Sequence, residues 1–190
     1  MNNADVMQKR LPGDLAIWFF ILAELTVFAA LFISFSVSKS MNPEMFAEGQ
    51  ATLHPMMGLI NTLSLITSSF FVAKAALFAA EGQLNKTSKW IWLGIAVGSI
   101  YIITKFMEYQ SLMALGYNLR TNTFYTLYFF ITFFHFMHVL MGIVILIVVA
   151  NKAKKGGYEE DITGVETGAS YWHMVDMVWV ILFPLIYVIK

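Results

Sequence analysis

The stretch ETGASYWHMVDMVWVILFPLIYVIK, residues 166–190, decides the fold class of this chain. Most of it is apolar and aromatic enough to cross a lipid bilayer, yet it also carries ionisable side chains. At roughly 100° per residue on a helix, Glu166, His173 and Asp176 fall in one stripe. Ionisable groups are costly against hydrocarbon, so this stripe has to face protein. The stretch therefore predicts a bundle of helices with a polar seam.

Four more apolar stretches precede it, and each exceeds the roughly 20 residues that a membrane-spanning helix needs. The expected transmembrane helices cover approximately residues 15–38, 55–80, 90–115, 124–150 and 167–189. Asp14, which follows Pro12 and Gly13, is a good N-cap for the first helix. The segment 39–53 is predicted to be a polar loop. We expect an all-α integral membrane protein with five transmembrane helices, forming a single domain over residues 1–190.

The basic residues predict the orientation in the membrane. With a cytoplasmic N-terminus, the inner segments hold Lys9, Arg10, Lys86, Lys89, Lys152, Lys154 and Lys155. The outer segments then hold only Lys39, Arg120 and Lys190. This bias favours an N-terminus in the cytoplasm and a C-terminus outside. A cleaved signal peptide is the alternative for the first span, but its apolar core would be shorter and would lack a carboxylate such as Glu24.

The composition excludes several classes of function. The chain is 58% hydrophobic and only 13% charged, whereas soluble domains carry about a quarter charged residues. Its formal net charge of zero argues against capture of nucleic acid. It has no cysteine, which excludes disulfides, iron–sulfur clusters and cysteine-ligated copper. It also has only four histidines, so it is poor in metal ligands.

Separate helices place ionisable groups at one depth. Counted from the cytoplasmic end, Glu24, His138 and Asp176 lie about 9 to 12 residues into their helices, which is about 14–18 Å deep. We interpret this coincidence as one buried polar cluster near the middle of the bilayer. Its predicted members are Glu24, His135, His138, Glu166, His173 and Asp176.

Two interpretations of this cluster stay open. The groups either pass protons or hold a metal, or they bond to one another or to a lipid headgroup and lock the bundle. His135 and His138 form only a two-ligand fragment, and a fixed metal site needs further ligands. We therefore predict no catalytic, cofactor or metal site in this chain.

Two other groups of side chains are expected to be structural. Lys105 and Glu108, at i and i+3 on one helix, are predicted to form an ion pair. The tryptophans are expected mostly near helix ends, in an interfacial aromatic belt, as for Trp18, Trp90, Trp92 and Trp172.

The motifs resemble subunit III of the haem-copper oxidases. The sequence YWHMVD at 171–176, followed by VW at 178–179, is similar to the last helix of that family. The sequence FHFMHV at 134–139 resembles the preceding helix, where the motif is His-Gly-x-His-Val, so that Phe136 stands in place of the glycine. Further matches in the same order are Glu108-Tyr109, Asn61-Thr62 with Ser68-Ser69, and Ala23-Glu24 with Phe28.

The chain looks like the five-helix form of that family, which lacks the first two of seven helices. Its opening PGDLAIW at 12–18 is similar to the NorE group, which is encoded with nitric oxide reductases. The resemblance implies an accessory subunit without redox centres in the bacterial cytoplasmic membrane. It would pack beside a catalytic subunit that holds haem and copper or non-haem iron, bind phospholipid and support proton uptake.

Two alternatives from other classes remain. The first is a free-standing transporter or channel that uses the polar cluster, although we find no inverted repeat and no pair of broken helices. The second is a membrane metalloenzyme built on His135, His138, His173 and Asp176.

Overall fold

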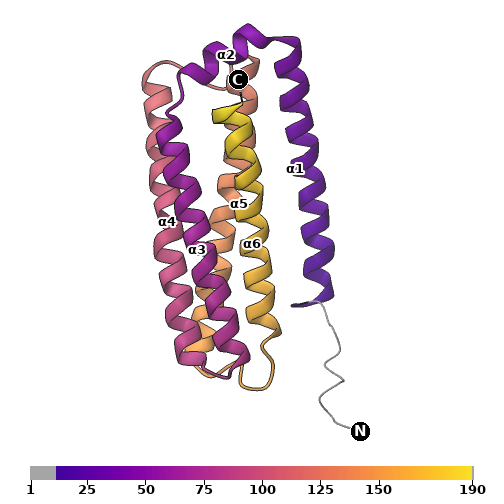
Figure 1. Ribbon diagram of the computed structural model, residues 1–190, viewed down its shortest axis with the longest axis vertical. Coiled ribbons are helices and arrows are strands. Elements are labelled where there is room, and N and C mark those ends of the chain that lie inside the picture. Colours follow the sequence, from indigo (N-terminus) through magenta and orange to yellow (C-terminus); the bar gives the residue numbers. More distant parts are fainter. Residues whose placement is uncertain (1–11, 190) are drawn as a thin grey trace.

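The computed structural model describes residues 12–189, and over that range the chain is all-helical (Figure 1). Its elements are α1 (Leu15–Met41), α2 (Pro43–Ala51), α3 (Pro55–Ala80), α4 (Leu84–Ala114), α5 (Thr123–Lys154), α6 (Thr163–Phe183) and the π-helical turn η1 (Pro184–Val188). Within the described range, five helices are long and apolar enough to cross a membrane, with α6 and η1 counted together. The prediction of an all-α protein with five candidate spans is confirmed.

The predicted cap of the first helix is present. The Asp14 side chain accepts a hydrogen bond from the Ala16 amide, and the preceding Gly13 has a φ of 83°, a left-handed conformation that favours glycine. Three of the residues used to predict orientation, Lys9, Arg10 and Lys190, lie outside the described residues.

The segment 39–53 is not simply a loop, because it contains α2. Pro43 occupies the first turn of this helix and Glu44 lies beside the positive end of the helix dipole. Phe46 is fully buried, with its ring 5.1 Å from Phe35 and 5.5 Å from Phe124, measured between centroids. Burial of this one aromatic side chain stabilises a short helix that composition alone does not favour.

Most of the long helices extend beyond the limits predicted from the apolar stretches of the sequence. The helix α4 begins at Leu84 rather than near residue 90, because Thr87 and Ser88 are buried and extend the helix through a polar stretch. The helix α5 continues to Lys154 and α6 begins at Thr163, a few residues beyond the expected limits. Hydropathy marks the part of a helix that lipid surrounds, and these polar turns extend past it.

The five long helices are not equally embedded in the bundle. In the span Thr163–Val188, half of the residues of its apolar 18-residue stretch are buried, whereas only 11% are buried in the corresponding stretch of α1. Figure 1 shows α6 lying between α3 and α1 with α5 behind it, and α1 standing at the edge of the bundle. The helix α6 is therefore the central element, and α1 attaches to α5 and α6 from one side.

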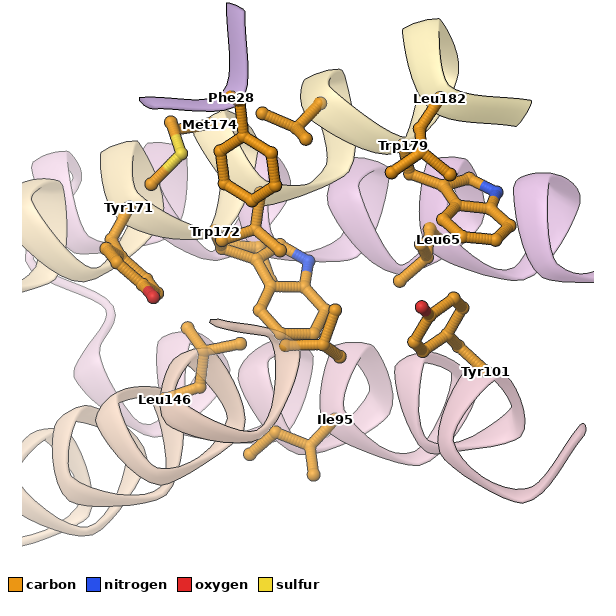
Figure 2. Close-up of a cluster of buried hydrophobic side chains, with 14 of the residues drawn as sticks. Phe28, Leu65, Ile95, Tyr101, Leu146, Tyr171, Trp172, Met174, Trp179 and Leu182 are labelled. Carbon is orange, nitrogen blue, oxygen red and sulfur yellow. The ribbon is translucent and has the colours of Figure 1, made fainter. Parts of the chain in front are cut away.

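The aromatic core is built around tryptophans of α6 (Figure 2). A Cβ atom on Gly98 or on Gly142 would lie 2.8 Å from the ring of Trp172, so both glycines are needed for the close approach. The prediction that Trp172 belongs to an interfacial belt was wrong, because this slot lets the indole enter the core. The other three named tryptophans lie near the beginning of their helices and keep exposed surface.

Candidate functional site

The six residues predicted as one polar cluster occupy four different places. Glu24 and His138 pair between α1 and α5, and His135 lies deeper in the core. His173 and Asp176 lie together on one side of α6, and Glu166 lies at the beginning of that helix. Each place has its own chemistry.

Glu24 and His138 join α1 to α5. His138 Nε2 lies 3.1 Å from Glu24 Oε2, and His138 Nδ1 lies 2.7 Å from the Phe134 carbonyl oxygen. A carbonyl only accepts, so Nδ1 carries a proton and donates. A hydrogen bond between Nε2 and the carboxyl group then needs one further proton on either atom, and with that proton the pair carries no net charge. A neutral pair suits the middle of a membrane-spanning helix.

His135 ties three helices together. It is fully buried, its Nε2 donates to the Val175 carbonyl at 3.0 Å, and its Nδ1 lies 3.0 Å from the Tyr101 hydroxyl. In the neutral imidazole Nδ1 accepts the Tyr101 proton, so both nitrogens are engaged. A metal ion could bind this side chain only by breaking one of these hydrogen bonds.

His173 and Asp176 lie on the side of α6 that faces out between α1 and α3. His173 Nδ1 hydrogen-bonds to the Ser69 hydroxyl and lies 3.7 Å from Asp176 Oδ2. The imidazole is 37% exposed and the carboxylate 13% exposed. None of the hydrogen bonds within residues 12–189 reaches the Asp176 carboxylate, because 3.7 Å is too long for one.

Glu166 contributes to the attachment of α1. Its carboxylate accepts a hydrogen bond from the Gly13 amide at 2.9 Å, and the neighbouring Thr167 hydroxyl accepts one from the Asp14 amide at 3.2 Å. These contacts fasten the start of α1 to the start of α6 and are separate from the Glu24–His138 pair.

A cage of polar side chains surrounds Lys105, and we call Lys105, Glu108, Tyr128 and Tyr187 the lysine cage. Lys105 Nζ donates to Glu108 Oε2 at 2.8 Å, to the Tyr128 hydroxyl at 3.0 Å and to the Tyr187 hydroxyl at 2.8 Å. These three partners use every N–H of the ammonium group. Tyr187 in turn donates to the Glu108 carboxylate at 2.9 Å. The ion pair predicted from the i,i+3 spacing is thus the centre of a larger network.

The charged centre of this cage is buried. The side chains of Lys105 and Glu108 are 0% and 1% exposed. Aromatic rings surround the ammonium nitrogen, with centroids between 4.8 Å for Tyr128 and 5.5 Å for Trp179, within cation–π range. Tyr128 and Tyr187 were not predicted as site residues from the sequence. The π-helical turn after Pro184 supplies Tyr187, and a proline in a helix was the one available signal.

The geometry restricts what these side chains do chemically. Within residues 12–189 no three His, Asp or Glu side chains converge as a metal site. The lysine cage holds its charges rigidly, whereas Glu24 and His138 can exchange one proton between them. On the side of α6 that carries His173 and Asp176, the imidazole is 37% exposed and so accessible from outside the described bundle.

Comparison with known proteins gives consistent relatives. A family model described as cytochrome c oxidase subunit III matches residues 5–190. Cytochrome c oxidase subunit 3 of Thermostichus vulcanus is 32% identical over 172 residues, which cover 90% of this chain and 84% of that protein. The protein of the same name from Corynebacterium diphtheriae is 32% identical over 175 residues, which cover 90% and 85%. Heme-copper oxidase subunit I+III of Aeropyrum pernix is 27% identical over 182 residues, covering 92% of this chain and 22% of that longer protein.

Proposed function

The chain belongs to the cytochrome c oxidase subunit III family, and from this premise we propose that it is a non-catalytic accessory subunit of a bacterial respiratory haem-copper oxidoreductase. Haem and copper, or non-haem iron, are then held by the catalytic subunit. The observation that carries this proposal is the state of the core histidine: both nitrogens of His135 are used in holding helices together. A chain whose core histidine is used in this way would stabilise a redox partner through helix packing and would not bind the redox centres itself.

The comparisons favour a catalytic subunit as the neighbour in the membrane. The Aeropyrum relative is named as subunit I and subunit III in one polypeptide, and this name supports subunit I as the proposed neighbour of this chain. Its relatives in Thermostichus and Corynebacterium favour the bacterial cytoplasmic membrane as the location. The PGDLAIW motif at 12–18 favours a nitric oxide reductase, and the names of the relatives favour a cytochrome c oxidase.

Bound phospholipid is part of the same proposal. An apolar cavity of about 690 Å³ lies between α4 and α5, with Tyr109, Phe129 and Phe136 among its lining residues. Aromatic walls of this kind suit an acyl chain, which would fill the cavity and stiffen the contact between the two helices.

The experiment is purification of the tagged full-length chain from membranes in a mild detergent, with visible spectroscopy and mass spectrometry of the chains that copurify. We expect a haem-containing catalytic subunit. Haem b and c with a nitric oxide reductase would identify a NorE-type subunit, and oxidase subunits would identify an ordinary subunit III. A colourless protein without partners would contradict the accessory role and leave a transporter to be tested.

A role in proton uptake is the narrower part of the proposal. Because His138 Nδ1 donates to Phe134, only Nε2 can exchange a proton with Glu24. In Glu24→Gln the amide still donates to Nε2 but supplies no acidic proton. We expect the assembled complex to form in normal amount and to turn over more slowly.

Glu166→Gln is the matched control for this variant. The amide oxygen of the new side chain would still accept a hydrogen bond from the Gly13 amide. Position 166 lies in the first turn of α6, whereas Glu24 lies within the membrane-spanning part of α1. Turnover should be unchanged in this control. Equal turnover in wild type and Glu24→Gln, at equal assembly, would remove proton uptake from the proposal.

A further inference from the structure

One side of α6 is apolar, uncovered by the described helices and interrupted by two polar groups. We call His173, Asp176, Met177, Val180 and Ile181 the α6 strip. Met177 and Ile181 are 55% and 52% exposed, and the imidazole of His173 is 37% exposed. Figure 1 shows this helix between α3 and α1 with α5 behind it, so the uncovered side is the one that faces away from α5.

Asp176 is a residue of the strip to which none of the described residues donates a hydrogen bond. It lies near the middle of the span Thr163–Val188, and its carboxylate is 13% exposed. No hydrogen bond inside the described range 12–189 reaches it, and its one charged or titratable neighbour is His173 Nδ1 at 3.7 Å. That nitrogen already bonds to the Ser69 hydroxyl, so it has no second hydrogen to offer the carboxylate while the imidazole is neutral.

The depth of Asp176 restricts what can cover it. A carboxylate at the centre of a membrane-spanning helix is energetically costly when it faces the bilayer core. Acyl chains offer no hydrogen-bond donor, and lipid headgroups lie at the bilayer surface, about 15 Å from its middle. A protein helix that crosses the membrane can bring a donor to this depth.

We propose that the α6 strip is the docking surface for a transmembrane helix of the catalytic subunit, and that this helix donates a hydrogen bond to Asp176. The inference rests on the proposed function, since it takes its partner from there. Met177, Val180 and Ile181 supply the apolar contact, and His173 lies beside the bond and orders it. A hydroxyl, amide, indole or guanidinium group on the partner provides the donor.

The absence of native cysteine makes the surface directly testable. A single Val180→Cys in the tagged full-length chain, labelled in native membranes with a photoactivatable maleimide, cross-links whatever lies on the strip. We expect a cross-link to the catalytic subunit. Val148→Cys is the matched control, an exposed valine on α5, and it should give at least tenfold less of this product.

A second variant tests the donor. We expect Asp176→Leu to lower the amount of catalytic subunit that copurifies by about tenfold, which corresponds to about 1.4 kcal/mol. The thermal stability of the purified single chain should stay unchanged, which separates loss of docking from loss of folding. Val180→Trp should also block docking, whereas Val148→Trp should not.

The outcomes separate this inference from the proposed function. If wild type copurifies with the catalytic subunit but Val180→Cys cross-links only lipid or a second copy of this chain, the docking surface is overturned and the accessory role stands. Full copurification of Asp176→Leu would overturn the donor. If wild type itself brings down no catalytic subunit, the proposed function fails, and the inference fails with it.

Discussion

The lysine cage and the α6 strip both place ionisable side chains within membrane-spanning helices, and they differ in how those groups are satisfied. In the cage, Lys105 and Glu108 are 0% and 1% exposed and every ammonium hydrogen has an acceptor. On the strip, Asp176 is 13% exposed and the hydrogen bonds of residues 12–189 do not reach it. The chain thus satisfies the charges of the cage by itself, whereas none of the described residues donates a hydrogen bond to Asp176.

The pair of Glu24 and His138 is intermediate between the two. It is satisfied within the chain, but Glu24 is 20% exposed and α1 is the least embedded helix of the bundle. We expect substitutions in the closed cage to destabilise the fold. We propose that the open strip binds a partner helix and that the Glu24–His138 pair exchanges a proton. Under the two proposals above, the degree of closure separates the structural from the functional ionisable groups of this protein.

Removal of the charge at the centre of the cage should have the largest effect. Lys105→Met leaves the Glu108 carboxylate buried without its counter-ion, so we expect a loss of about 3–5 kcal/mol in the free energy of unfolding. Reversible unfolding of the purified chain in mixed detergent micelles measures it. The double variant Lys105→Met/Glu108→Leu should regain most of the loss. A single variant within 1 kcal/mol of wild type would show that the cage is not closed.

A smaller effect is expected from a hydroxyl of the cage. Tyr187→Phe removes the group that accepts from Lys105 and donates to Glu108, while the ring keeps its packing. The expected loss is about 1–3 kcal/mol, because two buried charged groups each lose one partner. The same unfolding assay applies, with Tyr117→Phe, a tyrosine outside the cage, as the control. Equal values for the two variants would contradict the prediction.

The smallest effect should come from the strip. Asp176→Asn changes a group to which none of the residues 12–189 hydrogen-bonds, so the unfolding free energy of the purified chain should stay within about 0.5 kcal/mol of wild type. Glu108→Gln, the same change of chemistry inside the cage, should cost several times more. If the two substitutions cost the same, the distinction between a closed and an open polar group would fail.

The sequence predicted the cage in part and for a local reason. Lys105 and Glu108 are three residues apart on one helix, so their contact follows from helical geometry alone. Tyr128 and Tyr187 are 23 and 82 residues from Lys105, and no local pattern connects them to it. Likewise, α2 depends on Phe46 packing against Phe35 and Phe124, which come from two other helices.

Trp172 shows the same limit. Its position in a span was clear from hydropathy, but an aromatic ring fits the interface and the core equally well. The glycines that admit it, Gly98 and Gly142, lie on two other helices. Whether a tryptophan enters the core depends on the space opposite it, and that space is a property of three helices together.

The sequence by itself determined that this is a five-span helical protein, because the thickness of the bilayer sets the length and apolarity of each span. It also determined that Glu166, His173 and Asp176 share one stripe, because the helical repeat is constant. Only the tertiary structure decided what that stripe faces. Trp172, Val175 and Trp179 occupy the side of α6 toward the bundle, and this leaves Asp176 at its edge. A helical repeat relates residues within one helix, whereas their surroundings depend on how the other helices pack.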